Sequence, residues 1–327
     1  MKGGRILFGI FAGTAVGSML CGLACLLAVY AVYPQNGSAA GYITLPSLAL
    51  IPVAIGLVAA WVWRPLKLSL GRTLLYSMVC FGASLAAAAL IFREGLICVI
   101  ILSPILLLGI VAGALTGRIW FRRDRTRVYL WVAPVFAGIV VAEPTWRDSH
   151  HSVVTDELRI AAPPARVWPH VLAFRPIVET PGYWLFRLGL PYPTETTNGG
   201  DFVGADRACR FSGDAVFKER IVEFAPPQRL TFDILESPPE PELLGHLEAY
   251  RGQFELRANA DGTSTLLGRT WYSLQVRPAF YFDWWTHAIF SEVHLRVMRN
   301  VKRLTEIEAE AARTAGPIAE GAQGVRR

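Results

Sequence analysis

The sequence predicts a membrane α-helical bundle of four or five spans, followed by a water-soluble α+β domain with an antiparallel sheet and a long C-terminal helix. Its apolar share of 53% and charged share of 18% make the 327-residue chain too apolar for an ordinary soluble protein. Long uncharged runs fill the first 142 residues, and short alternating runs follow them. Charge divides the chain at the same place, because subtracting the +9 of the first 142 residues from the overall +6 leaves −3 for the remainder.

We therefore expect a transmembrane domain over residues 1–142, a linker over 143–151, a soluble domain over 152–313 and a disordered tail over 314–327. The pI of about 9.2 then reflects loops beside a bilayer and gives no support to a nucleic-acid partner. Four of the five cysteines lie in apolar runs, and Cys209 is alone in the second part. No disulfide can form within that part, and no Cys/His cluster indicates structural zinc.

The first apolar run, Ile6 to Tyr33, contains no charge and exceeds the roughly 20 residues that cross a hydrocarbon core. It is also longer than the roughly 7–15 apolar residues of a secretory signal, so we expect a retained helix. A fifth run, with 15 residues, is short for a span unless a flanking arginine snorkels, which leaves the count at four or five. The later runs are Ile43 to Trp63, Leu74 to Phe92, Leu96 to Trp120 and Val128 to Ala142.

The basic residues of the first part predict the orientation, since cytoplasmic loops carry an excess of Lys and Arg. Lys2 and Arg5 lie on the same side of the predicted membrane as the other basic residues of the first part. The exception is Arg93, the one basic residue on the opposite side before the fifth run. The N-terminus of this cell-membrane protein should be cytoplasmic. The soluble domain is then extracytoplasmic with five spans and cytoplasmic with four.

Two of the apolar runs carry a glycine at every fourth residue, which lets helix backbones approach closely in lipid. The rows serve either compact packing within one chain or a homodimer interface. No ionisable side chain lies in the middle of a span, which lowers the expectation of a transporter. The rows are Gly9, Gly13 and Gly17, and Gly109, Gly113 and Gly117.

The second part predicts one strand, two short helices, a meander and a terminal helix. Ser152 to Ile160 alternates like a strand, Ala165 to Val171 resembles a short helix, and Arg175 to Asn198 is an irregular connection with a second short helix. Short turns imply antiparallel neighbours for five further strands. An apolar stripe from Ala279 to about Arg313 predicts a long helix lying on the sheet. The five strands are Gly204 to Phe211, Ala215 to Phe224, Arg229 to Leu235, Leu247 to Arg257 and Ser264 to Val276.

Three segments in this order resemble the START/Bet v 1-like superfamily, also called SRPBCC or polyketide cyclase/dehydrase-like. They are Ile160-Ala-Ala-Pro-Pro-Ala-Arg-Val-Trp168, Glu219-Arg-Ile-Val-Glu-Phe-Ala-Pro-Pro-Gln-Arg-Leu-Thr-Phe232 and Gly262-Thr-Ser-Thr-Leu266. The resemblance covers roughly Ser152 to Glu306. It implies a helix-grip fold, in which a curved sheet grips the last helix around an apolar cavity that binds lipids, sterols, polyketides or other hydrophobic molecules.

Such a cavity needs aromatic walls and one or two polar groups that orient the ligand. Alternation places Glu219 on one strand face with Phe217 and Ile221. There it either pairs with a base such as Arg269 or has a pKa raised by burial, which would suit an acid catalyst. The aromatic candidates are equally good core residues, and the dense run from Phe280 to Trp285 could instead contact the bilayer. Those aromatic candidates are Phe254, Trp271, Phe280, Trp284 and Trp285.

The histidines give no metal motif. His287 and His294 lie two helical turns apart with Glu292 between them, whereas chelating helical pairs are usually three or four residues apart. We expect solvated helix positions for both, and His150-His151 lies in the linker. We expect no metal and no cofactor, and the sequence contains no nucleophile elbow, phosphate-binding loop, dinucleotide fingerprint or paired carboxylates.

The sequence thus favours membrane-anchored binding or transfer of a hydrophobic small molecule or lipid. A second hypothesis is a cyclase- or hydrolase-like enzyme with Glu219 as its acid, although no catalytic motif supports it. A third is a structural or regulatory membrane protein whose soluble domain binds another protein, and an exposed apolar patch would indicate it.

Overall fold

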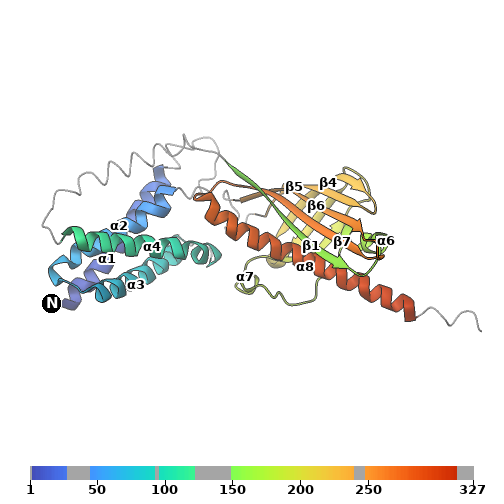
Figure 1. Ribbon diagram of the computed structural model, residues 1–327. Coiled ribbons are helices and arrows are strands. Elements are labelled where there is room, and N and C mark those ends of the chain that lie inside the picture. The colour runs from blue at the N-terminus through green and yellow to red at the C-terminus, as the bar shows by residue number, and fades with distance from the viewer. Residues whose placement is uncertain (1, 28–44, 93–95, 122–148, 239–246, 315–327) are drawn as a thin grey trace, which may run out of the picture. The chain divides into compact units, whose positions relative to one another are not determined.

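The computed structural model describes residues 2–27, 45–92, 96–121, 149–238 and 247–314, which form two compact units (Figure 1). The first unit consists mainly of four apolar helices: α1 (Lys2–Leu27), α2 (Leu45–Trp63), α3 (Leu70–Ala87) and α4 (Leu96–Trp120). A 3-10 turn, η3 (Arg64–Leu66), follows α2, and a π-helical turn, η4 (Ala88–Phe92), follows α3. All four helices are long and apolar enough to cross a membrane. The candidate fifth span, Val128 to Ala142, lies outside the described residues.

Both glycine rows face α2 of the same chain. A Cβ atom added to Gly113 of α4 would lie 2.1 Å from the carbonyl oxygen of Val53. One added to Gly13 of α1 would lie 2.9 Å from the carbonyl oxygen of Ile55. Only glycine permits these approaches, so the observed role of the rows is packing within one chain.

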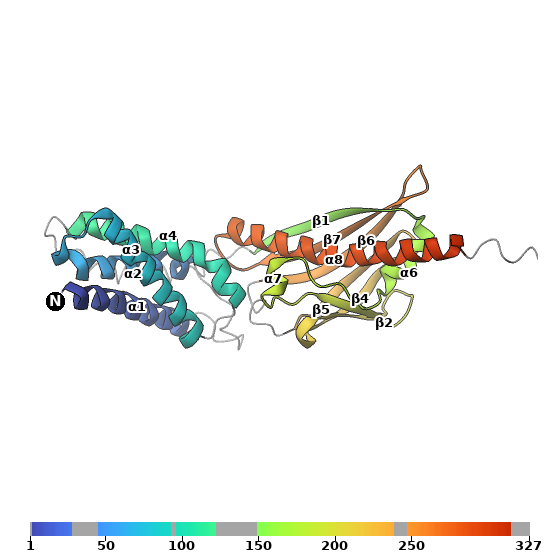
Figure 2. The same cartoon turned by 90° about the horizontal axis from the view of Figure 1, so that it is seen from below.

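The second unit is a curled seven-stranded antiparallel sheet with a long helix across its concave face (Figure 2). The strand order is β1-β7-β6-β5-β4-β3-β2. Short turns join β3 to β4, β4 to β5 and β6 to β7, as the sequence predicted, and β5 and β6 are antiparallel neighbours. The strands are β1 (His150–Ile160), β2 (Pro193–Asn198), β3 (Asp206–Phe211), β4 (Val216–Ala225), β5 (Arg229–Glu236), β6 (Leu247–Ala258) and β7 (Ser264–Leu274), with the 3-10 turn η8 (Ser212–Asp214) between β3 and β4.

Three helices accompany this sheet: α6 (Pro164–Leu172), α7 (Trp184–Arg187) and α8 (Ala279–Thr314). The predicted short helices are present, and α6 begins at a proline that suits the first turn. The segment from Arg175 to Asn198, expected to be irregular, also contains β2. That edge strand is rich in threonine and pairs only with β3, so it lacks the apolar alternation of a strand with a buried face.

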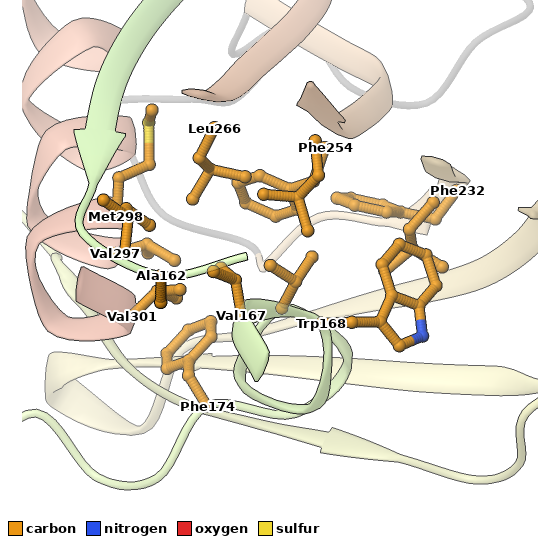
Figure 3. Close-up of a cluster of buried hydrophobic side chains, with 14 of the residues drawn as sticks. Ala162, Val167, Trp168, Phe174, Phe232, Phe254, Leu266, Val297, Met298 and Val301 are labelled. Carbon is orange, nitrogen blue, oxygen red and sulfur yellow. The ribbon is translucent and has the colours of Figure 1, made fainter. Parts of the chain in front are cut away.

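The main core of this unit lies where α6 and the second half of α8 close over β4 to β7 (Figure 3). The Trp168 ring packs edge-on against Phe224, with centroids 5.8 Å apart. Gly252 leaves room for the Phe232 ring, since an added Cβ would lie 2.4 Å from it. This end of the sheet is therefore filled by side chains, including Val167, Leu230, Phe254, Leu256, Leu266, Val297, Met298 and Val301.

Candidate functional site

The concave face of the sheet carries a line of inward-facing side chains on β4. Phe217, Glu219 and Ile221 alternate to this face, as the sequence predicted. The register places Arg207 of β3 directly opposite Glu219 and pairs Cys209 with Phe217. One buried cation and one buried carboxylate therefore meet inside an otherwise apolar interior.

Arg207 and Glu219 form a buried ion pair. Arg207 Nη1 donates to Glu219 Oε2 over 2.9 Å, and the two side chains are only 2% and 6% exposed. The guanidinium carbon also lies 4.5 Å from the centroid of the Phe232 ring. Burial raises the pKa of Glu219 from its ordinary 4.5 to about 7, against the opposing effect of Arg207.

The expected partner of Glu219 was wrong. Arg269 lies on the face of β7 away from α8, where it donates to Gln253 over 2.6 Å and to Glu255 over 2.8 Å. Its neighbour Thr270 faces α8, so alternation turns Arg269 outward. The basic partner came from the adjacent strand β3, whose register the sequence alone did not give.

The ion pair leaves one donor unused. Arg207 Nε is buried and has no hydrogen-bond partner among the residues that the structure describes. Trp285 Nε1 on α8 is likewise buried without a partner in the described part of the chain. Native proteins satisfy the great majority of buried N–H groups through protein atoms or ordered water, so each of these two donors can donate to a water or ligand oxygen as its partner.

Apolar side chains continue from the ion pair toward the β3–β4 turn. The rings of Phe211 and Phe217 lie 4.7 Å apart, and Ile234 of β5 pairs across from Glu219. These three side chains are half-buried, in contrast to the fully buried Ile221 and Leu230. This end of the concave face thus offers an accessible apolar wall beside a polar anchor.

A second polar cluster, which the sequence did not predict, joins β1, β7 and α8. His294 Nδ1 lies 2.8 Å from Asp156 Oδ2, and His294 Nε2 lies 2.7 Å from Thr270 Oγ1. Ser291 Oγ donates to the other Asp156 oxygen over 2.6 Å. The solvated position expected for His294 was wrong, since the residue is 5% exposed, whereas His287 is exposed.

No family model and no curated protein match the sequence. The strand order, together with the long helix across the concave face, decides the fold. The C-terminal half has the helix-grip fold that the resemblance implied. Solved structures that match this half share low sequence identity with it.

A norcoclaurine synthase point mutant from Thalictrum flavum, in complex with a transition-state analogue, is 15% identical over 50% of this chain and 99% of its own, with a TM-score of 0.36. A protein from Nitrosospira multiformis is 17% identical over 49% of this chain and 99% of its own, with a TM-score of 0.34. Ara h 8.0201 is 13% identical over 48% of this chain and 99% of its own, also with a TM-score of 0.34.

The aromatic candidates occupy different places in the structure. Phe254 is a core residue, and Trp271 lies with Arg269 on the face of β7 away from α8, so it does not line the helix-facing side. Phe280 and Trp284 are 78% and 64% exposed. Trp285 is half-buried and contacts Trp284, with ring centroids 4.9 Å apart.

Two surface hollows are lined entirely by described residues of the helix-grip domain, and Glu219 lines neither of these two. One, of about 400 Å³, lies beside the β4–β5 turn and the end of β6. The other, of about 230 Å³, lies between α8 and the segment from Ile177 to Phe186. The enzyme hypothesis required Glu219 to face a solvent-connected cavity, so its ion pair and burial weigh against that role.

Proposed function

We propose that this protein is a membrane-anchored binding or transfer protein for a hydrophobic small molecule or lipid, held on the concave face of the helix-grip domain. The observation that carries the proposal is the unused Nε donor of Arg207, buried beside the half-exposed apolar wall of Phe211, Phe217 and Ile234. A ligand with an apolar body and one hydrogen-bond acceptor complements both features. The fold is consistent with this role, because helix-grip domains generally bind ligands.

The energetics favour such a ligand. An unsatisfied buried donor costs about 1–3 kcal/mol, and a ligand acceptor would recover that cost. Each square ångström of apolar surface that the ligand covers adds roughly 25 cal/mol. The Arg207–Glu219 pair also fixes the guanidinium, so little side-chain entropy remains to be lost on binding.

The four apolar helices supply the second half of the proposal. An apolar molecule concentrates in the bilayer, so a domain tethered there samples its ligand at high local concentration. We propose a cytoplasmic N-terminus from the distribution of basic residues, with the helix-grip domain outside the cytoplasm if Val128 to Ala142 forms a fifth span. Compartment-specific reporters fused to the C-terminus test this sidedness.

Mass spectrometry of apolar extracts from the detergent-purified full chain tests the binding function. The double variant Arg207→Met, Glu219→Leu replaces the buried ion pair with apolar side chains, an exchange that proteins often tolerate. The matched control is Arg220→Met, Asp206→Asn, which removes an exposed pair on the opposite face of the same two strands.

We expect one apolar species carrying an oxygen or nitrogen acceptor to co-purify with the wild type and the control. The double variant should lose about tenfold in occupancy, the equivalent of one hydrogen bond of about 1.4 kcal/mol. Recovery of the same species in equal amounts from all three proteins would contradict the assigned anchor. Recovery of no apolar species from the wild type, beyond bulk membrane lipid, would contradict the function itself.

A further inference from the structure

The smaller hollow of the helix-grip domain has a lining that the interior ligand does not explain. One wall is α8, where Arg296, Arg299 and Arg303 lie at helical spacings of three and four residues. The opposite wall is the segment from residue 177 to residue 186, in which Ile177, Tyr183 and Phe186 supply apolar surface. At about 230 Å³ the hollow suits a small polar group better than a drug-sized ligand or an acyl chain.

Arg296 is fixed by backbone carbonyls and a ring, and Glu179 acts on its charge from a distance without forming an ion pair with it. Its Nε donates to the carbonyl oxygen of Pro193 over 3.1 Å, and Nη2 donates to that of Glu179 over 2.9 Å. The guanidinium carbon lies 4.7 Å from the centroid of the Tyr192 ring. Within the described ranges, no carboxylate oxygen forms an ion pair with it. Backbone carbonyls and a ring therefore orient this cation without neutralising it.

Of the other two arginines, Arg299 is loosely paired and Arg303 closely paired. Arg299 Nη1 lies 3.8 Å from Glu292 Oε2, a loose contact between partly exposed groups. Arg303 Nε lies 2.5 Å from Glu179 Oε1, and its Nη2 donates to Asn300 over 2.8 Å. With three arginines and two glutamates the lining carries a net charge of +1, so it favours an anionic occupant.

An exposed aromatic patch adjoins the same hollow. Tyr183 lines the hollow, and its ring centroid lies 6.2 Å from that of Trp184. Trp184 in turn lies 6.4 Å from Trp285, which contacts Trp284. Trp184 is 46% exposed. An exposed tryptophan ring is unfavourable in water, whereas tryptophan and tyrosine are enriched at the headgroup level of a bilayer.

We infer that the arginine hollow binds the phosphate of an anionic lipid headgroup while the neighbouring Trp184, Trp284 and Trp285 enter the interfacial zone of the bilayer. The adjacency of the two features favours this source of phosphate over a free anion, because free phosphate gives no reason for exposed tryptophans beside it. The chain's own apolar helices keep such a surface within reach. The headgroup site is separate from the interior ligand site.

Hydrogen–deuterium exchange of the full chain in lipid nanodiscs tests this inference at peptide resolution. Three conditions separate the sources: phosphatidylcholine alone, phosphatidylcholine with added inorganic phosphate, and phosphatidylcholine mixed with phosphatidylglycerol. Arg299→Gln removes one headgroup contact without touching a backbone hydrogen bond, and Trp184→Ala removes the patch on α7. Arg251→Gln, an exposed arginine paired with Asp233 on the sheet, is the matched control.

We expect hydrogen exchange in residues 177–187 to slow about fivefold with phosphatidylglycerol and to be unchanged in the other two conditions. A change of about fivefold corresponds to the free energy that one arginine gains near an anionic surface. Arg299→Gln and Trp184→Ala should each abolish most of that protection, and Arg251→Gln should retain it. Equal protection in all lipids, protection by inorganic phosphate alone, or an unchanged response in Arg299→Gln would each overturn the inference. Co-purification of the interior ligand with Arg299→Gln, measured in the same preparations, should persist, and its parallel loss would show that the two sites are one.

Discussion

His294 Nδ1 on α8 lies 2.8 Å from Asp156 Oδ2 on β1, which joins the last helix to the first strand of the helix-grip domain. The same carboxylate accepts from Ser291, and the other nitrogen of His294 meets Thr270 of β7. This cluster attaches the first half of α8 to one edge of the sheet. The apolar core attaches the second half of α8 to strands β4 to β7. The position of the first half of α8 therefore depends on these polar contacts, and that of the second half on the apolar core.

Asp156→Asn should loosen α8 from β1. Burial raises the pKa of Asp156, but the hydrogen bonds from His294 and Ser291 and the charges of His294 and His287 together hold it below its usual 3.8. This carboxylate therefore stabilises the fold above about pH 4, and its contribution is lost as pH falls through the lowered pKa. At pH 7 we expect a loss of about 2 kcal/mol, measured by unfolding, with faster hydrogen exchange in β1 and α8.

Asp233→Asn is the control for this change, because it removes a partly exposed partner of Arg251. A surface pair of that kind contributes about 0–1 kcal/mol. Equal losses in Asp156→Asn and Asp233→Asn at pH 7 would show that the cluster does not fasten the helix.

Glu219→Gln should change how stability depends on pH. Because burial raises the pKa of Glu219 to about 7, the folded state keeps a proton that the unfolded state releases near pH 4.5. The wild type therefore loses stability relative to the variant as pH rises from about 4.5 to about 7. Glutamine still offers an oxygen to Arg207, so the two proteins should melt at similar temperatures at pH 4, and the variant should melt higher at pH 8.

The control for that series is Glu236→Gln on β5, which alters an exposed partner of Lys218, the neighbour of Glu219 on β4. Its difference from the wild type should stay small at every pH. A difference between Glu219→Gln and the wild type that does not change between pH 4 and pH 8 would contradict the raised pKa.

Gly252→Ala should disturb the Arg207–Glu219 ion pair through the Phe232 ring. The new methyl group would lie 2.4 Å from the Phe232 ring, and the Arg207 guanidinium packs over the same ring. We expect a destabilisation of about 1–3 kcal/mol from overpacking, measured by thermal unfolding, and a lower yield of co-purified ligand. Adding Phe232→Leu should restore stability without restoring ligand. Gly182→Ala, where an added Cβ meets no atom within 4 Å, should leave both unchanged.

Gly113→Ala should weaken the membrane bundle. An added Cβ would meet the backbone oxygen of Val53 at 2.1 Å, and a backbone atom cannot turn away as a side chain can. We expect α2 and α4 to separate and the solubilised chain to melt at a lower temperature. Gly82→Ala on α3 meets no atom within 4 Å and should be neutral or slightly stabilising. Indistinguishable melting of the two variants would contradict the close approach of α2 and α4.

The architecture followed from the sequence because its signals were long and regular. Uncharged runs predicted four or five apolar helices, of which four lie in the described residues, and the turn residues after β3, β4 and β6 predicted an antiparallel meander. Strand β2 was missed, because a short strand rich in threonine, with one glutamate, shows no alternation of apolar and polar residues. The boundaries of the remaining elements differed by a few residues.

The site was harder to predict, because its contacts join positions distant in sequence. Alternation placed Glu219 on the correct face, but its partner depends on the β3–β4 register, which selects Arg207 and leaves Arg269 outside. His294 gave no local motif, since its partners Asp156 and Thr270 lie on two other strands. An acidic residue at an inward position of β1, between the inward positions of Val154 and Leu158, was the one sequence signal that could have indicated the cluster.

Photo-crosslinking with an apolar diazirine probe carrying one hydroxyl group, on the full chain in nanodiscs, tests the central claim most directly. Binding on the concave face predicts labelled peptides at Cys209, Phe217 and Ile234, less labelling in Arg207→Met, Glu219→Leu, and none at the outward-facing Lys218 and Arg251. Labelling confined to α1 to α4, or equal on both faces of the sheet, would contradict ligand binding by the helix-grip domain.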